Sequence, residues 1–318
     1  MTPPIIADPT ALALGVDLGG TKVEAALVDP DGVVVPGTRF RAPTGRASSS
    51  EQLAASVREV VGGALAALPA GSVLLGVGIG SAGPIAVDRG LVSPLNLPSW
   101  RDYPLRDLVL SIVPDGTPVT LRMDGQCIAL AEHWVGAGQG VDNLMGMIVS
   151  TGIGGGLILG GVVVPGPTGN AGHIGHVEVG GFDDVCDCGG IGCVEGIASG
   201  PKTVAWARRR GFTGATGEEL AAAYAAGDPI AAAAVERAGR AIGQSIASAT
   251  ALVDLDVIAI GGGFSHVTPD IFEHINRAIA GRVQFGFVTK ARAVPSALSG
   301  EGPLIGAAAL IHRAEHVG

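Results

Sequence analysis

Three of the four cysteines of this chain, Cys186, Cys188 and Cys193, lie in one short segment together with several glycines. Glycine lets the backbone turn tightly, so three sulfur atoms can be directed at one point. A closed structural zinc site needs four ligands, and thiolates with imidazole suit Zn²⁺ better than they suit harder cations. The segment therefore predicts a Cys₃His zinc site, with the fourth ligand a histidine upstream.

A disulfide is the alternative interpretation of these cysteines. Cys186 and Cys188 are separated by one residue and would bridge poorly, and three cysteines cannot all pair among themselves. The rest of the chain has the features of an intracellular protein, where disulfides are rare. The metal site is the preferred interpretation.

The composition excludes several classes of protein. At 318 residues, with 47% hydrophobic and 15% charged residues, the chain can form two globular domains. A net charge of −9 without a block of lysine or arginine argues against a nucleic-acid or anionic-membrane partner. No apolar run is long enough to span a membrane, and residues 1–10 contain three prolines and no basic segment. We expect a cytoplasmic protein.

The first half of the chain opens on two strand-like runs, Leu12 to Asp17 and Val23 to Val28, joined by a glycine turn. A Walker loop or a Rossmann loop would lead into a helix instead. Small residues in such a hairpin let backbone N–H groups surround phosphate oxygens, and Asp17 can hold a hydrated Mg²⁺. An ordinary glycine hairpin is the alternative. The candidate phosphate-binding residues are Gly19, Gly20, Thr21 and Lys22.

The cysteine segment also carries a longer motif. Gly175-His176 is followed, after nine residues, by Cys-x-Cys-Gly-x-x-Gly-Cys-x-Glu, which begins at Cys186 and ends at Glu195. This motif resembles the signature of the ROK family of repressors, open reading frames and sugar kinases. The resemblance implies that zinc is held by His176, Cys186, Cys188 and Cys193. It also implies that Glu195 and the residues just before His176 contact a sugar.

The resemblance implies an α/β, duplicated actin-like (ribonuclease H-like) fold, with two domains around a nucleotide and sugar cleft. We place the N-terminal domain at residues 1–121, joined by a C-terminal helix at 303–318, and the larger domain with the zinc segment at 122–302. Leu144 to Val164 repeats the strand, glycine turn, strand plan, and Val257 to Ile260 ends in another glycine loop. Structural turns remain the alternative at both places. The implied nucleotide contacts are Thr151, Gly152, Gly154, Gly155, Gly262 and Gly263.

Asp124 follows a short predicted strand, Val119 to Arg122, and precedes a helical pattern. On spacing alone, Asp124 is a helix cap. ROK kinases read Asn-Asp-x-x-x-x-x-x-x-Glu at this junction, and Asp124 and Glu132 fit that motif. The resemblance makes Asp124 the base that accepts the proton of the attacking sugar hydroxyl. Met123 replaces the family asparagine and removes one polar anchor for the sugar.

Three further positions are implied sugar contacts. Gly83 lies in a loop similar to the family's Gly-x-Pro-Gly loop, although a plain turn is the alternative. Asn96 begins a match to the family's Asn-Leu-x-x-Trp segment. His173 stands where glutamate is commoner in the family, and this histidine resembles that of bacterial N-acetylmannosamine kinases. A neutral imidazole can donate a hydrogen bond to an N-acetyl carbonyl, which glutamate cannot do.

Together these features predict an ATP-dependent kinase that phosphorylates a primary hydroxyl of a hexose or hexosamine. N-acetylmannosamine or a related hexosamine ranks ahead of glucose. Its cofactors would be ATP, Mg²⁺ and a structural Zn²⁺, and we expect a homodimer. A strict glucokinase, a cyclitol kinase and a non-catalytic sugar sensor are the alternatives. A repressor is disfavoured, because the first strand begins near Leu12 and leaves no room for a winged-helix domain.

Overall fold

The computed structural model describes residues 10–298 and 300–318. The segment in which we expected no targeting sequence therefore lies almost wholly outside the described residues. The chain forms two compact units. The first contains Met1–Val135, Val162–Ala171 and Gly300–Gly318, and the second contains Gly136–Gly161 and Gly172–Ser299.

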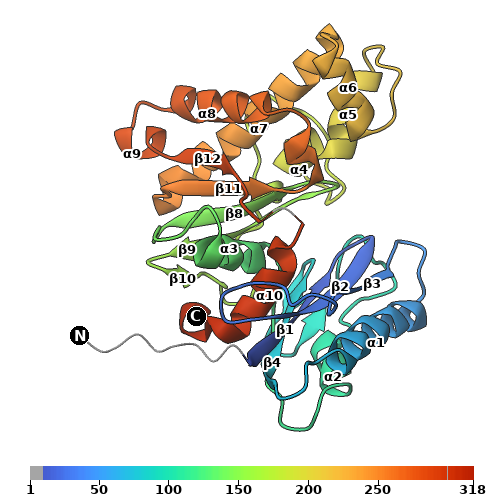
Figure 1. Ribbon diagram of the computed structural model, residues 1–318. Helices are drawn as coiled ribbons and strands as arrows, with labels where there is room; N and C mark the ends of the chain where they lie inside the picture. Colours follow the sequence, from blue (N-terminus) through green and yellow to red (C-terminus); the bar gives the residue numbers. More distant parts are fainter. Residues whose placement is uncertain (1–9, 299) are drawn as a thin grey trace. The chain divides into compact units, whose positions relative to one another are not determined.

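The first unit is built on a five-stranded sheet in the order β3-β2-β1-β4-β7 (Figure 1). Strands β1 and β2 are antiparallel, whereas β1, β4 and β7 are parallel. The strands are β1 (Ala11–Leu18), β2 (Lys22–Val28), β3 (Phe40–Pro43), β4 (Val73–Ser81) and β7 (Val119–Met123), and a small second sheet pairs β5 (Ile85–Ala86) with β6 (Leu91–Val92). The helices are α1 (Ser50–Ala66), α2 (Leu105–Leu110), α3 (Asp124–Val135) and α10 (Gly302–His312).

Helix α1 begins at a capping box, in which Ser49 accepts from the Gln52 N–H and Gln52 accepts from the Ser49 N–H. Its apolar residues recur at helical spacing and are buried with those of β1, β2 and β4 in one core. This helix therefore covers one face of the first sheet.

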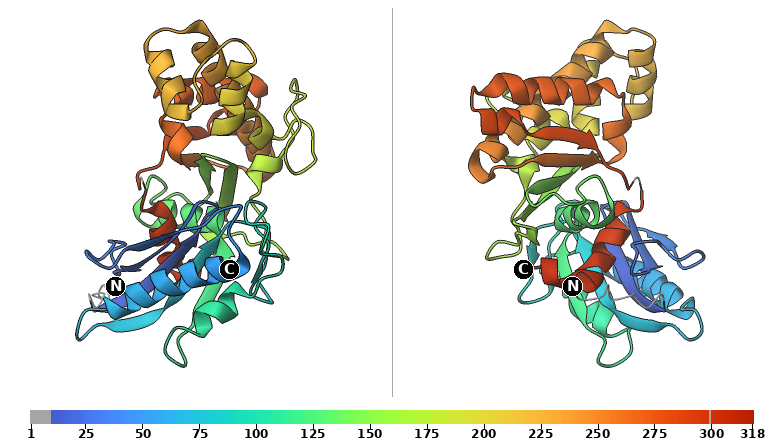
Figure 2. Two further views of the ribbon diagram at one scale, coloured as in Figure 1. Left: turned by 90° about the vertical axis from the view of Figure 1, so that its right-hand side faces the viewer. Right: turned by 60° about the vertical axis from the view of Figure 1, so that its left-hand side comes forward.

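Helix α10 packs against strands β1 and β4 and against α3 (Figure 2, right). Glycines make this close approach possible. A Cβ on Gly78 would overlap the Ala307 carbonyl, and a Cβ on Gly306 would overlap the Cys127 carbonyl. The glycine and alanine run of the last helix thus permits the close packing that the sequence predicts.

This packing gives a division of the chain that differs from the expected boundary at residues 121/122. Because α3 packs on α10 and β4, it belongs to the first compact unit, which also includes residues 162–171. The strand and helix that flank Asp124 are therefore held in a single unit.

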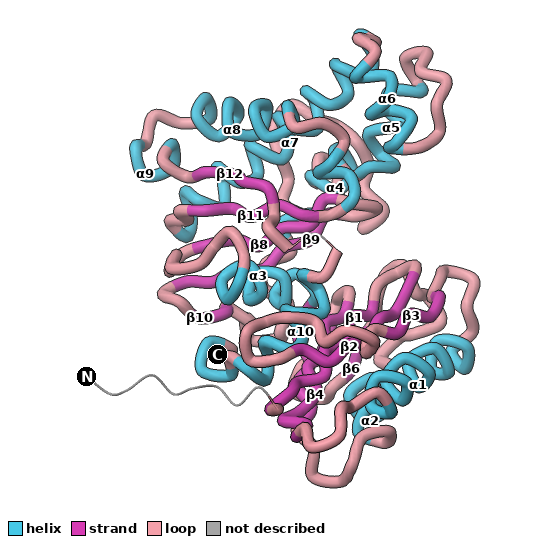
Figure 3. The backbone as a smooth tube through the Cα atoms, viewed as in Figure 1, coloured by secondary structure: helices cyan, strands magenta, loops and turns pink. Residues whose placement is uncertain are grey.

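The second unit contains most of a sheet in the order β10-β9-β8-β11-β12, whose last four strands belong to it (Figure 3). Its strands are β8 (Leu144–Val149), β9 (Ile153–Leu159), β11 (Val257–Gly261) and β12 (Arg292–Pro295), preceded at the edge by β10 (Val162–Val163). The helices are α4 (Val194–Ala198), α5 (Gly200–Arg208), α6 (Gly217–Ala225), α7 (Pro229–Val253), α8 (Asp270–Arg282) and α9 (Gly286–Thr289). Buried residues of β8, β11, α7 and α8 form one core.

The second hairpin departs from the predicted plan in two places. The glycines of residues 154–156 lie within β9 rather than in a turn, and the expected strand from Leu157 to Val164 is broken at Gly160-Gly161, where φ is +59° and +77°.

Among the described residues, no helix is both long and apolar enough to cross a membrane.

Candidate active site and metal centre

The hairpin between β1 and β2 is a tight turn fixed from the side. The Gly19 N–H donates to the Lys22 carbonyl at 2.9 Å, and the Thr44 hydroxyl donates to the Gly19 carbonyl at 2.8 Å. A Cβ on Gly20 would overlap the side chain of Asn96. The structure therefore brings Asn96 against the predicted phosphate hairpin.

Asp17 and Asp124 are two acidic groups of the first unit with raised pKa values. Asp17, at 8% exposure, is buried near the end of β1. Burial, and then the negative charge of Asp124, raise its pKa to about 7, against the lowering effect of Lys22. Burial raises the pKa of Asp124 to about 6. A carboxyl group that titrates near neutral pH is suited to accept a proton during a reaction.

Asp124 is the first residue of α3, directly after β7. Its carboxylate accepts a hydrogen bond of 2.7 Å from the N–H of the next residue, Gly125. A capping side chain bonds to an N–H two or three residues further along. The contact seen here is therefore not the one that the helix-cap interpretation predicts. Met123 points into the core and is 2% exposed.

A cluster around Glu24 was not anticipated from the sequence. Glu24 is 2% exposed, lies opposite Asp17 in the β1–β2 register, and pairs with Lys22, with Arg39 at 3.0 Å and with Arg41 at 3.1 Å. These cations lower its pKa despite burial. The signal was available, since a glutamate inside an apolar strand needs buried partners. Glu24 fixes the side chain of Lys22 beside the hairpin.

The segment of residues 162–171 is bound to the rest of the first unit by side-chain amides. Gln126 of α3 donates to the carbonyls of Gly169 and Ala171, both at 3.1 Å. Asn170 accepts from the Ile85 N–H at 2.9 Å and donates to its carbonyl at 2.7 Å. The Asn170 bonds hold β5, the strand just after the Gly83 loop.

The four predicted metal ligands come together in the second unit. The ligand atoms of His176, Cys186, Cys188 and Cys193 all lie within 4.8 Å of one another. Cys188 Sγ is 3.7 Å from Cys193 Sγ, and Cys186 Sγ is 3.9 Å from His176 Nδ1. Bonds of about 2.3 Å to a tetrahedral zinc ion place sulfur atoms roughly 3.8 Å apart. The donor set and its spacing fit zinc.

Two candidate sugar contacts flank this cluster. Glu195, at the start of α4, accepts a hydrogen bond of 2.7 Å from the Ile153 N–H of the second hairpin. A Cβ on Gly152 would lie 2.7 Å from the same carboxylate oxygen, so a larger residue there would displace the Glu195 carboxylate. The ring centroids of His173 and His176 are 5.8 Å apart, and burial lowers the pKa of His173.

The third glycine loop lies next to the second hairpin. Gly262 has φ +95°, and a Cβ there would lie 2.6 Å from the Val149 carbonyl at the end of β8. Gly263 is near Ser150, since its Cβ would be 3.7 Å from the Ser150 hydroxyl. Thr151 is exposed beside them, whereas Gly155 packs against Ile174. The structure thus brings these residues together beside the end of β8.

The model of the ROK family matches residues 13–314. The chain is 35% identical over 254 residues to an N-acetylmannosamine kinase of Yersinia pseudotuberculosis. The matched residues make up 78% of this chain and 82% of that protein. It is 34% identical over 309 residues to a kanosamine kinase of Amycolatopsis mediterranei, covering 95% and 96%.

Among solved structures, the chain is similar to a ROK family glucokinase from Streptomyces griseus in complex with glucose and AMPPNP. The TM-score is 0.81 at 30% identity, covering 95% of this chain and 99% of that one. This similarity confirms the expected fold class, a mixed α/β actin-like ATPase fold in two domains. The chain belongs to the ROK family.

Proposed function

We propose that this protein is an ATP-dependent kinase that phosphorylates a primary hydroxyl of a hexose or hexosamine. The observation that carries the proposal is the environment of Asp124, a carboxyl group with a pKa of about 6 at a strand-to-helix junction. The family membership and the kinase relatives support it. A sugar sensor would need no such base.

Asp124 accepts the proton of the sugar hydroxyl as the hydroxyl oxygen attacks the γ-phosphorus of ATP. The bond from that phosphorus to the β,γ-bridging oxygen breaks, and ADP leaves. Catalysis of such a transfer consists mainly of positioning and charge neutralisation. Here Asp124 positions the attacking hydroxyl and removes its proton.

The glycine loops hold the nucleotide. In the first unit, backbone N–H groups of residues 19–22 and the Lys22 side chain bind phosphate oxygens. Asp17 would hold Mg²⁺, which would neutralise phosphate charge. In the second unit, Thr151, Gly152, Gly154 and Gly155 take the same role for the phosphates. Gly262 and Gly263 leave room for the base and ribose.

The sugar contacts proposed in the second unit are His173, His176 and Glu195, and those in the first are Gly83 and Asn96. A zinc ion with four protein ligands has no open position, so its contribution is structural. His176, Cys186, Cys188 and Cys193 fix the segment that joins His173 to Glu195. The ring nitrogen of His176 that binds the metal is not available to the sugar. The proposed sugar contact of His176 therefore uses the rest of its ring.

The acceptor is a hexosamine in preference to glucose on this proposal. His173 can donate to an N-acetyl carbonyl, and relatives named N-acetylmannosamine kinase and kanosamine kinase support the choice. Met123 is buried, so position 123 supplies no polar contact to the ring. A strict glucokinase remains the second candidate, supported by the glucokinase structure.

A coupled assay of ADP release over glucose, mannose, N-acetylmannosamine and a cyclitol tests the function, with ³¹P NMR to identify a phosphomonoester on the primary carbon. No sugar-dependent ADP release from zinc-loaded protein would overturn it.

We also propose a cytoplasmic homodimer, on the family resemblance. Light scattering on the purified chain tests the dimer, and a monomer mass would overturn that proposal.

A further inference from the structure

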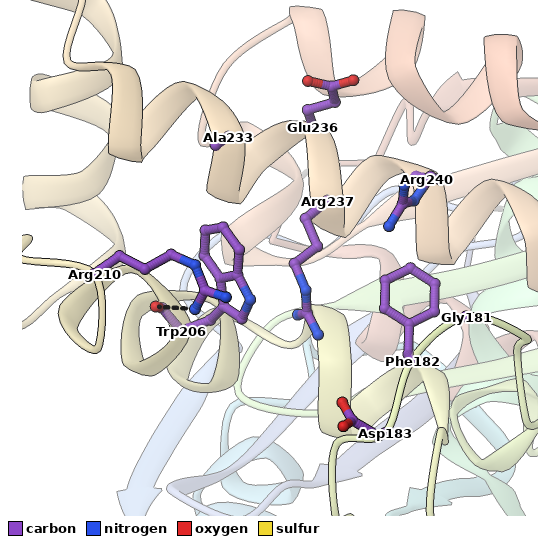
Figure 4. A pocket seen from close by; sticks show the side chains of 9 residues that line it. All are labelled: Gly181, Phe182, Asp183, Trp206, Arg210, Ala233, Glu236, Arg237 and Arg240. Carbon is purple, nitrogen blue, oxygen red and sulfur yellow. Dashed lines mark hydrogen bonds between the residues drawn. The ribbon is translucent and has the colours of Figure 1, made fainter.

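A pocket of about 420 Å³ lies on the second unit, and none of the residues that line it is assigned above to ATP or sugar (Figure 4). Helix α5, helix α7 and the chain just before the cysteines form its walls. Its volume is in the lower part of the range of small-molecule sites, roughly 300–1,000 Å³. The lining residues are Gly181, Phe182, Asp183, Trp206, Arg210, Ala233, Glu236, Arg237 and Arg240.

Two aromatic rings and three guanidinium groups form the centre of this pocket. The guanidinium carbon of Arg210 is 3.7 Å from the centroid of Trp206, and that of Arg240 is 4.9 Å from the centroid of Phe182. Arg237 lies between the two rings, 5.3 Å from Trp206 and 5.1 Å from Phe182 (Figure 4). Stacking on aromatic rings leaves guanidinium N–H groups directed outward, where they can bind an anion.

The three arginines are not equally engaged by the protein. Arg237 pairs with Asp184 and donates to the Ile197 carbonyl at 3.1 Å. Arg210 and Arg240 form no ion pair with any described residue, and Arg210 makes one long hydrogen bond, 3.4 Å, to the Trp206 carbonyl. Both side chains belong to exposed residues. Their donors are therefore available to a ligand.

The pocket also has acceptors. The carboxylates of Asp183 and Glu236 are exposed parts of its lining. Such groups accept hydrogen bonds from hydroxyls, and the Phe182 and Trp206 rings offer apolar surface for C–H groups. A simple anion would use the arginines alone. A ligand with both a phosphate and several hydroxyls would use the arginines and the carboxylates together.

We propose that this pocket binds a sugar phosphomonoester, with its phosphate held by the arginine side chains and its hydroxyls toward the exposed carboxylates of the lining. Arg–phosphate recognition through paired N–H donors supplies most of the specificity for the phosphate. The binding site rests on its own residues. Only its interpretation as a site for the enzyme's product class rests on the proposed function.

Calorimetric titration of glucose 6-phosphate into the zinc-loaded full-length chain, with Mg²⁺-AMPPNP and the best sugar present to occupy the catalytic residues, tests the proposal. We expect one binding event whose Kd rises at least tenfold in Arg240→Gln and in Arg210→Gln. Arg277→Gln, a change at an exposed arginine of α8, is the matched control and should bind as the native chain does.

The native chain provides a second measurement that needs no variant. The indole N–H resonance of Trp206, identified by its loss in Trp206→Phe, should shift on addition of glucose 6-phosphate and less on addition of inorganic phosphate or glucose. Unchanged affinity in both arginine variants, or an unmoved Trp206 signal, would overturn the site. Equal affinity for inorganic phosphate would overturn the sugar part. These readouts measure binding, so a chain without kinase activity would still give them.

Discussion

Glu195 Oε2 accepts a hydrogen bond of 2.7 Å from the backbone N–H of Ile153. This bond joins Glu195, two residues after the last cysteine ligand, to the first residue of β9, beside the glycine hairpin. Within the second unit, a proposed sugar contact and a proposed phosphate hairpin are thus fixed to each other. The cysteines of the metal cluster lie in the same segment, just before Glu195.

Changing Glu195 should weaken sugar binding more than nucleotide binding. Glu195→Gln keeps an acceptor for the Ile153 N–H but loses the charge, so we expect the KM for sugar to rise about tenfold or more, the scale of a charge-assisted hydrogen bond. The KM for ATP should change less. Initial rates with each substrate varied are the measurement.

The matched control is Glu178→Gln, because Glu178 is exposed in the same segment. A sugar KM that is unchanged in Glu195→Gln, or raised equally in both variants, contradicts the assignment of Glu195 as a sugar contact.

One zinc ion per chain should be found in protein purified without added metal. Three thiolates and one imidazole at this spacing suit that ion. Cys188→Ser should lose the zinc, whereas Cys127→Ser should retain it, because Cys127 is buried in α3 of the first unit. Elemental analysis is the measurement.

Chelation should remove sugar affinity before it unfolds the whole chain, since the metal supports a local segment. Less than about half an equivalent of zinc, with Cys186 and Cys193 in disulfides, would show that the cysteines are not a zinc site. Thiol titration under denaturing conditions distinguishes the two states.

His173 should select the sugar. We expect the native enzyme to prefer N-acetylmannosamine or a related hexosamine, and His173→Glu to shift kcat/KM toward glucose by about tenfold (~1.4 kcal/mol). The physical reason is that imidazole can donate a hydrogen bond and a carboxylate cannot. If native enzyme prefers glucose by more than about tenfold and the variant preserves that preference, His173 is not the selector.

The rate should depend on pH through the buried carboxyl group of Asp124. Burial raises the pKa of Asp124 to about 6, and a base must be ionised to accept a proton. The pH dependence of kcat/KM reports the ionisations of the free enzyme. We therefore expect kcat/KM to fall about tenfold per pH unit below pH 6. A flat profile from pH 5 to 7, at constant ionic strength, is incompatible with Asp124 as the base.

Stability should depend on pH in the opposite sense. A carboxyl whose pKa is higher in the folded chain than in the unfolded one favours folding when protonated, and this stability is lost as the pH rises through the folded value. For Asp17 that window runs from 3.8 to about 7. Asp17→Asn should therefore raise the Tm by about 2 °C or more at pH 7.5 and leave it nearly unchanged at about pH 4. A lower Tm at pH 7.5 contradicts this.

The sequence predicted the elements that have strong local signals. The hairpin at Gly19 and the helix after Asp124 follow from turn residues and apolar periodicity, and the three cysteines of the proposed zinc site follow from their spacing, whereas His176 came from the family resemblance. The cluster of Glu24 with Arg39 and Arg41 was missed, because these arginines lie 15 and 17 residues further along the chain, just before and within β3. The pairing of Arg237 with Asp184 joins residues far apart in the chain. Gly154 lies in a strand because pairing with β8 outweighs its weak strand propensity.

The central claim is that Asp124 is the base of a sugar kinase, and sugar-dependent ADP release by Asp124→Asn at pH 7.5 tests it most directly. Asparagine fits the same place and caps a helix as well as aspartate does, but it cannot accept the proton. The account predicts that kcat falls by roughly a hundredfold or more, with both KM values nearly unchanged and no loss of Tm. Near-native turnover in this variant would contradict it.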